Sequence, residues 1–129
     1  MKTLLTVTAV VEVGAGLALL GIPSATASLL FGAALQASAA VGLARIGGAA
    51  LLTLAMVCWL ARRDADGRAL RGLVAAMTFY NVAVAAVLAF ASFGDGLYGV
   101  LLWPAVAFHV AMAAWCVTSL LKTDGAILR

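Results

Sequence analysis

Charged side chains are scarce in this sequence of 129 residues: only 10% are Asp, Glu, Lys or Arg, whereas 66% are hydrophobic, and the mean hydropathy is +1.17. About a quarter of the residues in an ordinary soluble domain are charged. A soluble domain of this length could not cover so much apolar surface, so most of its solvent must be lipid. The scarcity of charge therefore excludes an ordinary soluble domain and favours an integral membrane protein.

Cysteine and histidine are equally rare. The two cysteines, Cys58 and Cys116, form no C-x-x-C motif, and His109 is the single histidine. We therefore expect neither thiol–disulfide exchange nor a metal site built from thiolates and imidazoles. Haem could take His109 from two copies across a dimer interface, or His109 together with Met77 or Met112. A lone membrane histidine is more often a hydrogen-bonding group, so we expect no haem and no other cofactor.

Catalytic and nucleotide-binding signatures are also missing. The sequence contains no serine hydrolase, P-loop or dinucleotide-binding fingerprint, so we expect no enzymatic activity. The net charge of +3 and the pI near 9.3 would suit a nucleic-acid partner. The basic residues, however, fall at one predicted membrane face, so we expect the lipid bilayer and no nucleic acid as the partner.

Four long apolar stretches dominate the sequence, and each is close to the length of about 20 residues that a spanning helix needs. They cover residues 4–20, 39–60, 70–90 and 100–121. Little of the chain remains outside them. We therefore predict a single transmembrane domain over residues 1–129, an all-α integral membrane four-helix bundle with up-down-up-down topology.

The segment between the first two stretches, residues 23–36, is too short to span a membrane. It contains the apolar cluster Leu29, Leu30 and Phe31, and it begins with Pro23, which is favoured in the first turn of a helix. This pattern predicts a short helix lying in the membrane interface. A re-entrant loop is the alternative.

Positive charge is distributed unevenly along the chain. With an up-down-up-down topology, seven of the eight basic residues fall on one side of the membrane, and Arg45 is the exception. The positive-inside rule then places both termini and the second connector in the cytoplasm. The seven residues are Lys2, Arg62, Arg63, Arg68, Arg71, Lys122 and Arg129.

One strongly polar side chain lies near the middle of each stretch: Glu12, Arg45, Asn81 and His109. Such groups are expensive in hydrocarbon, so each is a functional hypothesis. A rise of about 1.5 Å per residue places all four roughly 13 to 22 Å from the cytoplasmic ends of their helices, within one central slab. Small residues flank them on the same helical faces, so we expect them to face one another or a water-filled pocket. Thr8, Thr78, Tyr80 and Trp103 are candidate supporting residues.

Two interpretations of this polar layer remain open. In the first, Glu12 and Arg45 form a buried ion pair, and Asn81 and His109 complete the hydrogen bonds, so that the layer fixes helix register. The protein would then be a structural or accessory component, or a lipid- or small-ligand-binding one, acting as a homo-oligomer or within a larger membrane complex. In the second, it is a small oligomeric transporter or channel that uses Glu12 and His109 as a cation or proton site.

Four stretches resemble a group of uncharacterised small bacterial proteins with four hydrophobic segments. They are EVGAGLALLGIPSATASLLFGAAL, LARIGGAALLTLAMVCWLAR, TFYNVAVAAVLAF and LLWPAVAFHVAMAAW. The resemblance implies that Glu12, Arg45, Asn81 and His109 belong to the pattern of that group, and it implies no activity. It also implies a bacterial protein, so we expect the inner (plasma) membrane of a bacterium.

A second, local resemblance involves the first apolar stretch. The segment Ala9-Val10-Val11-Glu12-Val13 is similar to the first helix of the small multidrug resistance transporters, whose membrane carboxylate binds protons or cationic drugs. The length and the four-helix layout also match. The chain departs from that family in placing Arg45 in the second stretch, in lacking the later motifs and in its strong orientation bias.

Overall fold

The computed structural model describes residues 1–64 and 67–127, with side chains described as far as Lys122. Within these residues the secondary structure is entirely helical. The five helices are α1 (Lys2–Gly21), α2 (Pro23–Phe31), α3 (Ser38–Ala61), α4 (Arg68–Phe93) and α5 (Leu102–Ile127).

Four of these helices are long and apolar enough to cross a membrane: α1, α3, α4 and the Leu102–Lys122 part of α5. Each is about as long as the hydrocarbon core of a bilayer requires. The chain is therefore a multi-pass membrane protein by the length and composition of its helices.

The short helix α2 begins and ends where the local sequence predicts a break. The chain leaves the helical conformation at Ile22, and Pro23 then occupies the first turn of α2, as predicted. The helix ends at Gly32, whose φ of 76° lies in the left-handed region that glycine adopts without penalty. The helix is consequently shorter than the predicted segment 23–36.

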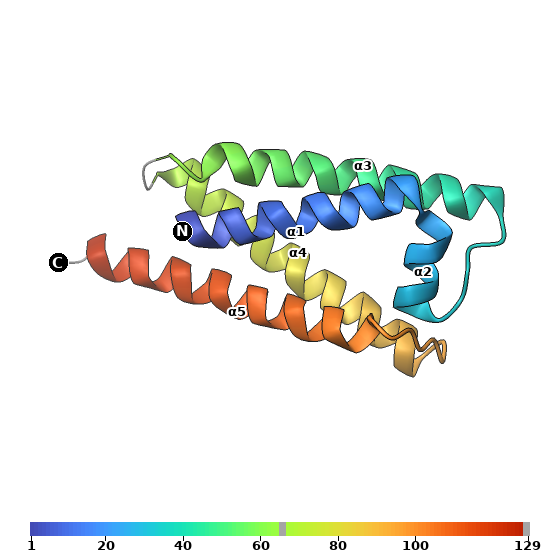
Figure 1. Ribbon diagram of the computed structural model, residues 1–129. Coiled ribbons are helices and arrows are strands. Elements are labelled where there is room, and N and C mark those ends of the chain that lie inside the picture. The colour runs from blue at the N-terminus through green and yellow to red at the C-terminus, as the bar shows by residue number, and fades with distance from the viewer. Residues whose placement is uncertain (65–66, 128–129) are drawn as a thin grey trace.

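The four long helices form two pairs, α1 with α3 and α4 with α5 (Figure 1). One end of the molecule carries Met1, the connector between α3 and α4 and the last turns of α5; we call it the amino-terminal end. The other end carries α2, the connector 32–37 and the connector between α4 and α5; we call it the α2 end.

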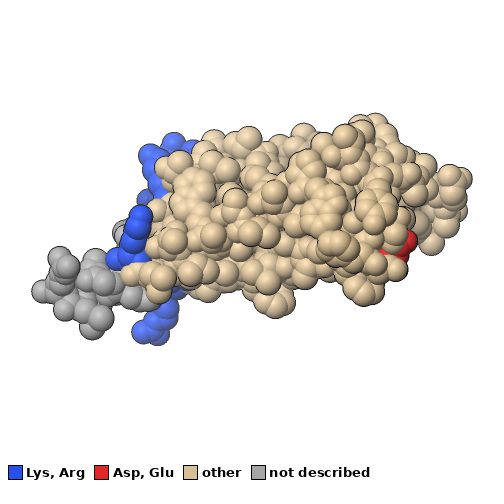
Figure 2. Space-filling view, turned by 90° about the horizontal axis from the view of Figure 1, so that it is seen from below, with Lys and Arg blue, Asp and Glu red and all other residues tan. Residues whose placement is uncertain are grey.

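Charged side chains are also divided between the amino-terminal end and the α2 end. Figure 2 shows Lys and Arg side chains gathered at the amino-terminal end, while acidic atoms appear at the opposite end and the visible face between them carries no charged group. A wide uncharged band between two polar ends is the surface that a bilayer accommodates.

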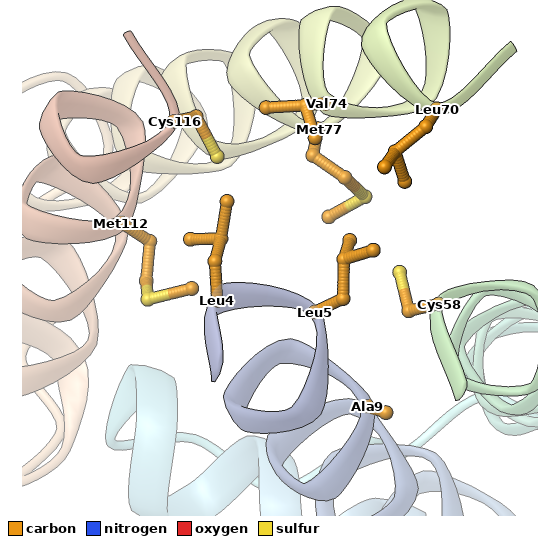
Figure 3. Close-up of a cluster of buried hydrophobic side chains, with 9 residues drawn as sticks. All are labelled: Leu4, Leu5, Ala9, Cys58, Leu70, Val74, Met77, Met112 and Cys116. Atoms are coloured by element: carbon orange, nitrogen blue, oxygen red, sulfur yellow. The ribbon is translucent and has the colours of Figure 1, made fainter. Parts of the chain in front are cut away.

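The main hydrophobic core lies toward the amino-terminal end, where side chains from all four long helices meet (Figure 3). Leu4 and Leu5 of α1 point into the space between the other helices, and both are almost completely buried. The remaining members of this core are Ala9, Cys58, Leu70, Val74, Met77, Met112 and Cys116.

At the α2 end, the backbone of α2 is joined to the connector before α5. The amide of Leu101 donates a hydrogen bond of 2.9 Å to the carbonyl oxygen of Leu29. Gly99 lies so close to the backbone of Leu29 and Leu30 that a Cβ at this position would overlap them. The helix α2 therefore contacts the α4–α5 pair as well as α1 and α3.

Candidate functional site

Glu12 lies in the middle of α1 and is only 4% exposed. Thr8 and Gly16, one turn away on either side, share its face and are also buried. The hydroxyl of Tyr80 in α4 donates a hydrogen bond of 3.1 Å to Glu12 Oε2. This bond joins one helix of the α1–α3 pair to one helix of the α4–α5 pair.

Asn81, the next residue of α4, is buried and is bonded to α5 rather than to α1. Its Nδ2 donates to the carbonyl oxygen of Met77 at 2.8 Å, and its Oδ1 lies 2.8 Å from His109 Nδ1. Because the amide nitrogen already donates to a carbonyl, Oδ1 is the acceptor in the second bond. The hydrogen-bond network therefore assigns a proton to His109 Nδ1.

The imidazole of His109 is held between two aromatic rings. The Tyr80 ring lies edge-on to it at 5.8 Å between centroids, and the Phe108 ring does so at 5.5 Å. Edge-to-face contacts of this kind are favourable for aromatic rings. Tyr80 thus contacts both Glu12 and His109, and we call Glu12, Tyr80, Asn81 and His109 the polar cluster.

The structure does not bring Arg45 to this cluster. Arg45 is exposed on α3, and no side chain in the described part of the chain forms a hydrogen bond or an ion pair with the Arg45 guanidinium. The reason is the pairing of α1 and α3, in which Gly16 lies opposite Gly48. Glu12 lies four residues from Gly16 toward the amino-terminal end, and Arg45 lies three residues from Gly48 in the other direction. Seven residues at about 1.5 Å each separate them by about 10 Å along the helix axes. Because Arg45 also lies on an exposed part of α3, its side chain does not close this distance, and the expected Glu12–Arg45 ion pair does not form.

The expected supporting residues divide in the same way. Tyr80 belongs to the polar cluster, whereas the hydroxyls of Thr8 and Thr78 donate to the carbonyl oxygens of Leu4 and Val74 within their own helices. Trp103 is packed edge-on against Phe93, with ring centroids 5.3 Å apart, near the α2 end of α5.

Sequence reasoning missed two features of the site. It named Tyr80 as a supporting residue but did not pair it with Glu12, although its place beside Asn81 on the same helix was visible. It also overlooked Phe108, whose ring packs on His109. Phe108 directly precedes His109 in the sequence, and this adjacency was the signal that could have identified it.

The polar cluster consists of two side-chain hydrogen bonds between helices, one from α4 to α1 and one from α5 to α4, with the rings of Tyr80 and His109 in edge-to-face contact between them. Within the described residues, no three His, Cys, Asp or Glu side chains lie close enough together to hold a metal ion. The two surface hollows described below are lined by other residues. In chemical terms the arrangement connects helices through hydrogen bonds and places two titratable groups, Glu12 and His109, on opposite sides of Tyr80.

No family model, curated protein or solved structure matches this chain.

Proposed function

We propose that this chain is a non-enzymatic structural or accessory protein of a bacterial inner membrane. In this proposal the polar cluster holds the α1–α3 pair against the α4–α5 pair. The observation that carries it is the hydrogen bond from Tyr80 to Glu12, because it is a side-chain bond between the two pairs at a depth where water is scarce. The sequence resemblance to small bacterial four-segment membrane proteins supports only the bacterial membrane location.

The proposed topology is up-down-up-down, with both termini in the cytoplasm and α2 in the opposite interface. The gathering of basic side chains at the amino-terminal end supports this orientation (Figure 2). The short α2, with Leu29 exposed beside the connector before α5, has the length and apolar character of an interfacial helix.

The cluster contains hydrogen bonds between helices and no ion pair in the described residues, which suits a positioning role. Side-chain hydrogen bonds between membrane helices contribute about 0.6 kcal/mol on average and at most about 2 kcal/mol. That is enough to select one packing of two helix pairs, because lipid itself provides no hydrophobic driving force between helices. The chain would act with further copies of itself, or within a larger membrane complex, since four slender helices enclose little interior.

A double-mutant cycle tests the structural role. Glu12→Ala and Tyr80→Phe each remove the Tyr80–Glu12 hydrogen bond, so each should lower the free energy of unfolding in detergent, and the double variant should lose less than the sum. The expected coupling is about 0.5–1.5 kcal/mol. Thr53→Val is the matched control, because it removes an exposed hydroxyl that is bonded only within α3. Additive losses would contradict the proposal.

Proton or cation transport is the second candidate function. It is favoured by one observation: two titratable groups, Glu12 and His109, both contact Tyr80, Glu12 through a hydrogen bond and His109 through its ring. Proton flux into liposomes that is abolished by Glu12→Gln or His109→Ala, with the fold intact, would support transport. Loss of stability without any flux in the parent protein would support the structural role instead.

A further inference from the structure

Two hollows lie on the α1–α3 pair, one apolar and one basic. The first is a groove of about 430 Å³, which we call the apolar groove. It is lined by Ala9, Val10, Val13, Leu52, Ala55, Met56 and Trp59. The second is a pocket of about 480 Å³ at the amino-terminal end, which we call the basic pocket. It is lined by Met1, Lys2, Leu5, Arg62, Arg63, Asp64 and Leu70.

The two hollows continue one another along the helix pair. On α1, Leu5 of the basic pocket lies one turn before Ala9 of the apolar groove. Leu5 and Ala9 therefore share a face of α1. Arg62 and Arg63 of the pocket directly follow the last residue of α3, and the Arg62 guanidinium is stacked on the ring of Trp59, which lines the groove. The groove therefore runs from the basic pocket toward the middle of the membrane.

The basic pocket holds an excess of positive charge. Three of its lining side chains are cationic, Lys2, Arg62 and Arg63, and one is anionic, Asp64. No described residue forms an ion pair with these three cations within 4.0 Å. Positive charge without carboxylate partners is what an anionic ligand recognises.

Arg62 sits at the junction of the two hollows. Its Cζ lies 3.1 Å from the centre of the Trp59 ring, so the guanidinium is stacked on the residue that ends the groove. Its Nη1 is buried and has no hydrogen-bond partner among the described residues. Desolvation, followed by the neighbouring charge of Arg63, lowers the pKa of Arg62 from its ordinary value. An anion placed beside Arg62 and Arg63 would offset the repulsion between their charges and would accept a hydrogen bond from Arg62 Nη1.

We propose that the basic pocket and the apolar groove together bind one anionic phospholipid, with its phosphate among Lys2, Arg62 and Arg63 and an acyl chain along α1 and α3. This goes beyond the proposed function and rests only on its membrane placement. The direction of the groove fits a lipid, since the charged pocket lies at the membrane surface and the apolar hollow leads inward.

A second copy of the chain fits the same surface less well. A copy inserted with the same orientation presents its own basic residues at the same membrane face, because Lys and Arg gather at that end (Figure 2). It could cover the groove, but it would bring further positive charge to the pocket. A lipid phosphate brings the opposite charge, so charge complementarity selects the lipid.

The test is a lipid titration of the purified protein, followed by native mass spectrometry. Phosphatidylglycerol and phosphatidylcholine with identical acyl chains are the probes. One phosphatidylglycerol should remain bound at concentrations at least about tenfold below those needed for phosphatidylcholine. Arg62→Gln and Arg63→Gln should each weaken phosphatidylglycerol binding about fivefold and leave phosphatidylcholine unchanged. Arg63 is exposed, so its substitution leaves the packing intact.

Arg68→Gln is the matched control. Arg68 is exposed, lies at the same end and carries the same charge, but does not line the pocket. Equal losses for Arg68→Gln and Arg62→Gln would show diffuse attraction only and would overturn the proposal. Glu12→Gln separates this site from the polar cluster, because phosphatidylglycerol binding should persist in that variant even if the cluster has another role.

A further experiment tests whether an acyl chain occupies the apolar groove. Val10→Trp fills the groove from a position that is 61% exposed, and it should weaken phosphatidylglycerol binding severalfold while the fold is unchanged. Inorganic phosphate should not displace the lipid at equal concentration. Complete displacement by phosphate, together with no effect of Val10→Trp, would show a site for free phosphate instead. If the protein forms dimers and binds phosphatidylglycerol and phosphatidylcholine equally, the groove and the pocket are the interface with a second copy of the chain.

Discussion

Gly16 of α1 and Gly48 of α3 lie opposite each other, so close that a Cβ on Gly16 would come within 2.9 Å of the Gly48 carbonyl oxygen. A Cβ on Gly48 would come within 2.8 Å of the Gly16 carbonyl oxygen. Small residues let membrane helices approach in this way, and the packing energy depends on that approach. The pair sets the register of α1 against α3, and with it the height of Glu12.

The first prediction follows from this contact. Gly48→Ala should destabilise the protein by about 1–3 kcal/mol, because the backbone of α1 would have to move away. Gly47→Ala is the control, since a Cβ at Gly47 would meet nothing within 4 Å and alanine favours the helix. Unfolding in mixed detergent, followed by circular dichroism, measures both. Equal stability of the two variants would rule out the close approach.

The second prediction concerns the proton on His109. In the native protein the imidazole should carry a proton on Nδ1, because Asn81 Oδ1 accepts a hydrogen bond from it. Asn81→Leu removes the acceptor at similar volume, so the Nδ1–H resonance should shift or exchange rapidly in ¹⁵N spectra of the labelled histidine. The variant should also lose about 1–2 kcal/mol of stability. An unchanged imidazole spectrum would contradict the assigned bond.

The long helices could be predicted from sequence because hydropathy alone defines them. Apolar runs of sufficient length, ended by groups such as Arg62-Arg63 and Gly94-Asp95, leave few alternatives to spanning helices. The predicted segment extends beyond the end of α2 because the apolar residues after Gly32 resemble a continuing helix in sequence. The structure turns at Gly32 instead, in the left-handed region, where a Cβ would overlap the backbone of Tyr98, a residue distant in sequence.

At the candidate site, the sequence predicts one property of each side chain and leaves another open. Counting residues gives the height of a side chain in the membrane but not the direction in which it points. Arg45 fell in the expected slab by height, yet it lies on an exposed part of α3. Asn81 and His109 do meet, because their helices pair directly. The pairing of α1 with α3 and of α4 with α5 decided both outcomes, and it arises from packing between distant segments.

The third prediction tests the attachment of α2. Gly99→Ala should push the connector away from Leu29 and Leu30 and so break the hydrogen bond from the Leu101 amide to the Leu29 carbonyl. Hydrogen exchange at Leu101 should become at least about tenfold faster, since the loss of about 1.4 kcal/mol of local stability corresponds to that factor. Gly42→Ala, where a Cβ would meet nothing within 4 Å, is the control. Unchanged exchange would show that α2 is held by other contacts.

The fourth prediction uses the two thiols as reporters of helix separation. Cys58 and Cys116 come from different helix pairs, and both are fully buried in the core at the amino-terminal end. A maleimide should therefore label the native protein in detergent only when the pairs separate. Glu12→Ala removes the acceptor for Tyr80 between the pairs, so labelling should become about five- to tenfold faster, as expected for a loss of about 1 kcal/mol or slightly more.

Thr53→Val is the control for this experiment and should leave the labelling rate unchanged. Rapid labelling of the native protein would contradict the packing of this core, and an unchanged rate in Glu12→Ala would remove the polar cluster as the link between the pairs.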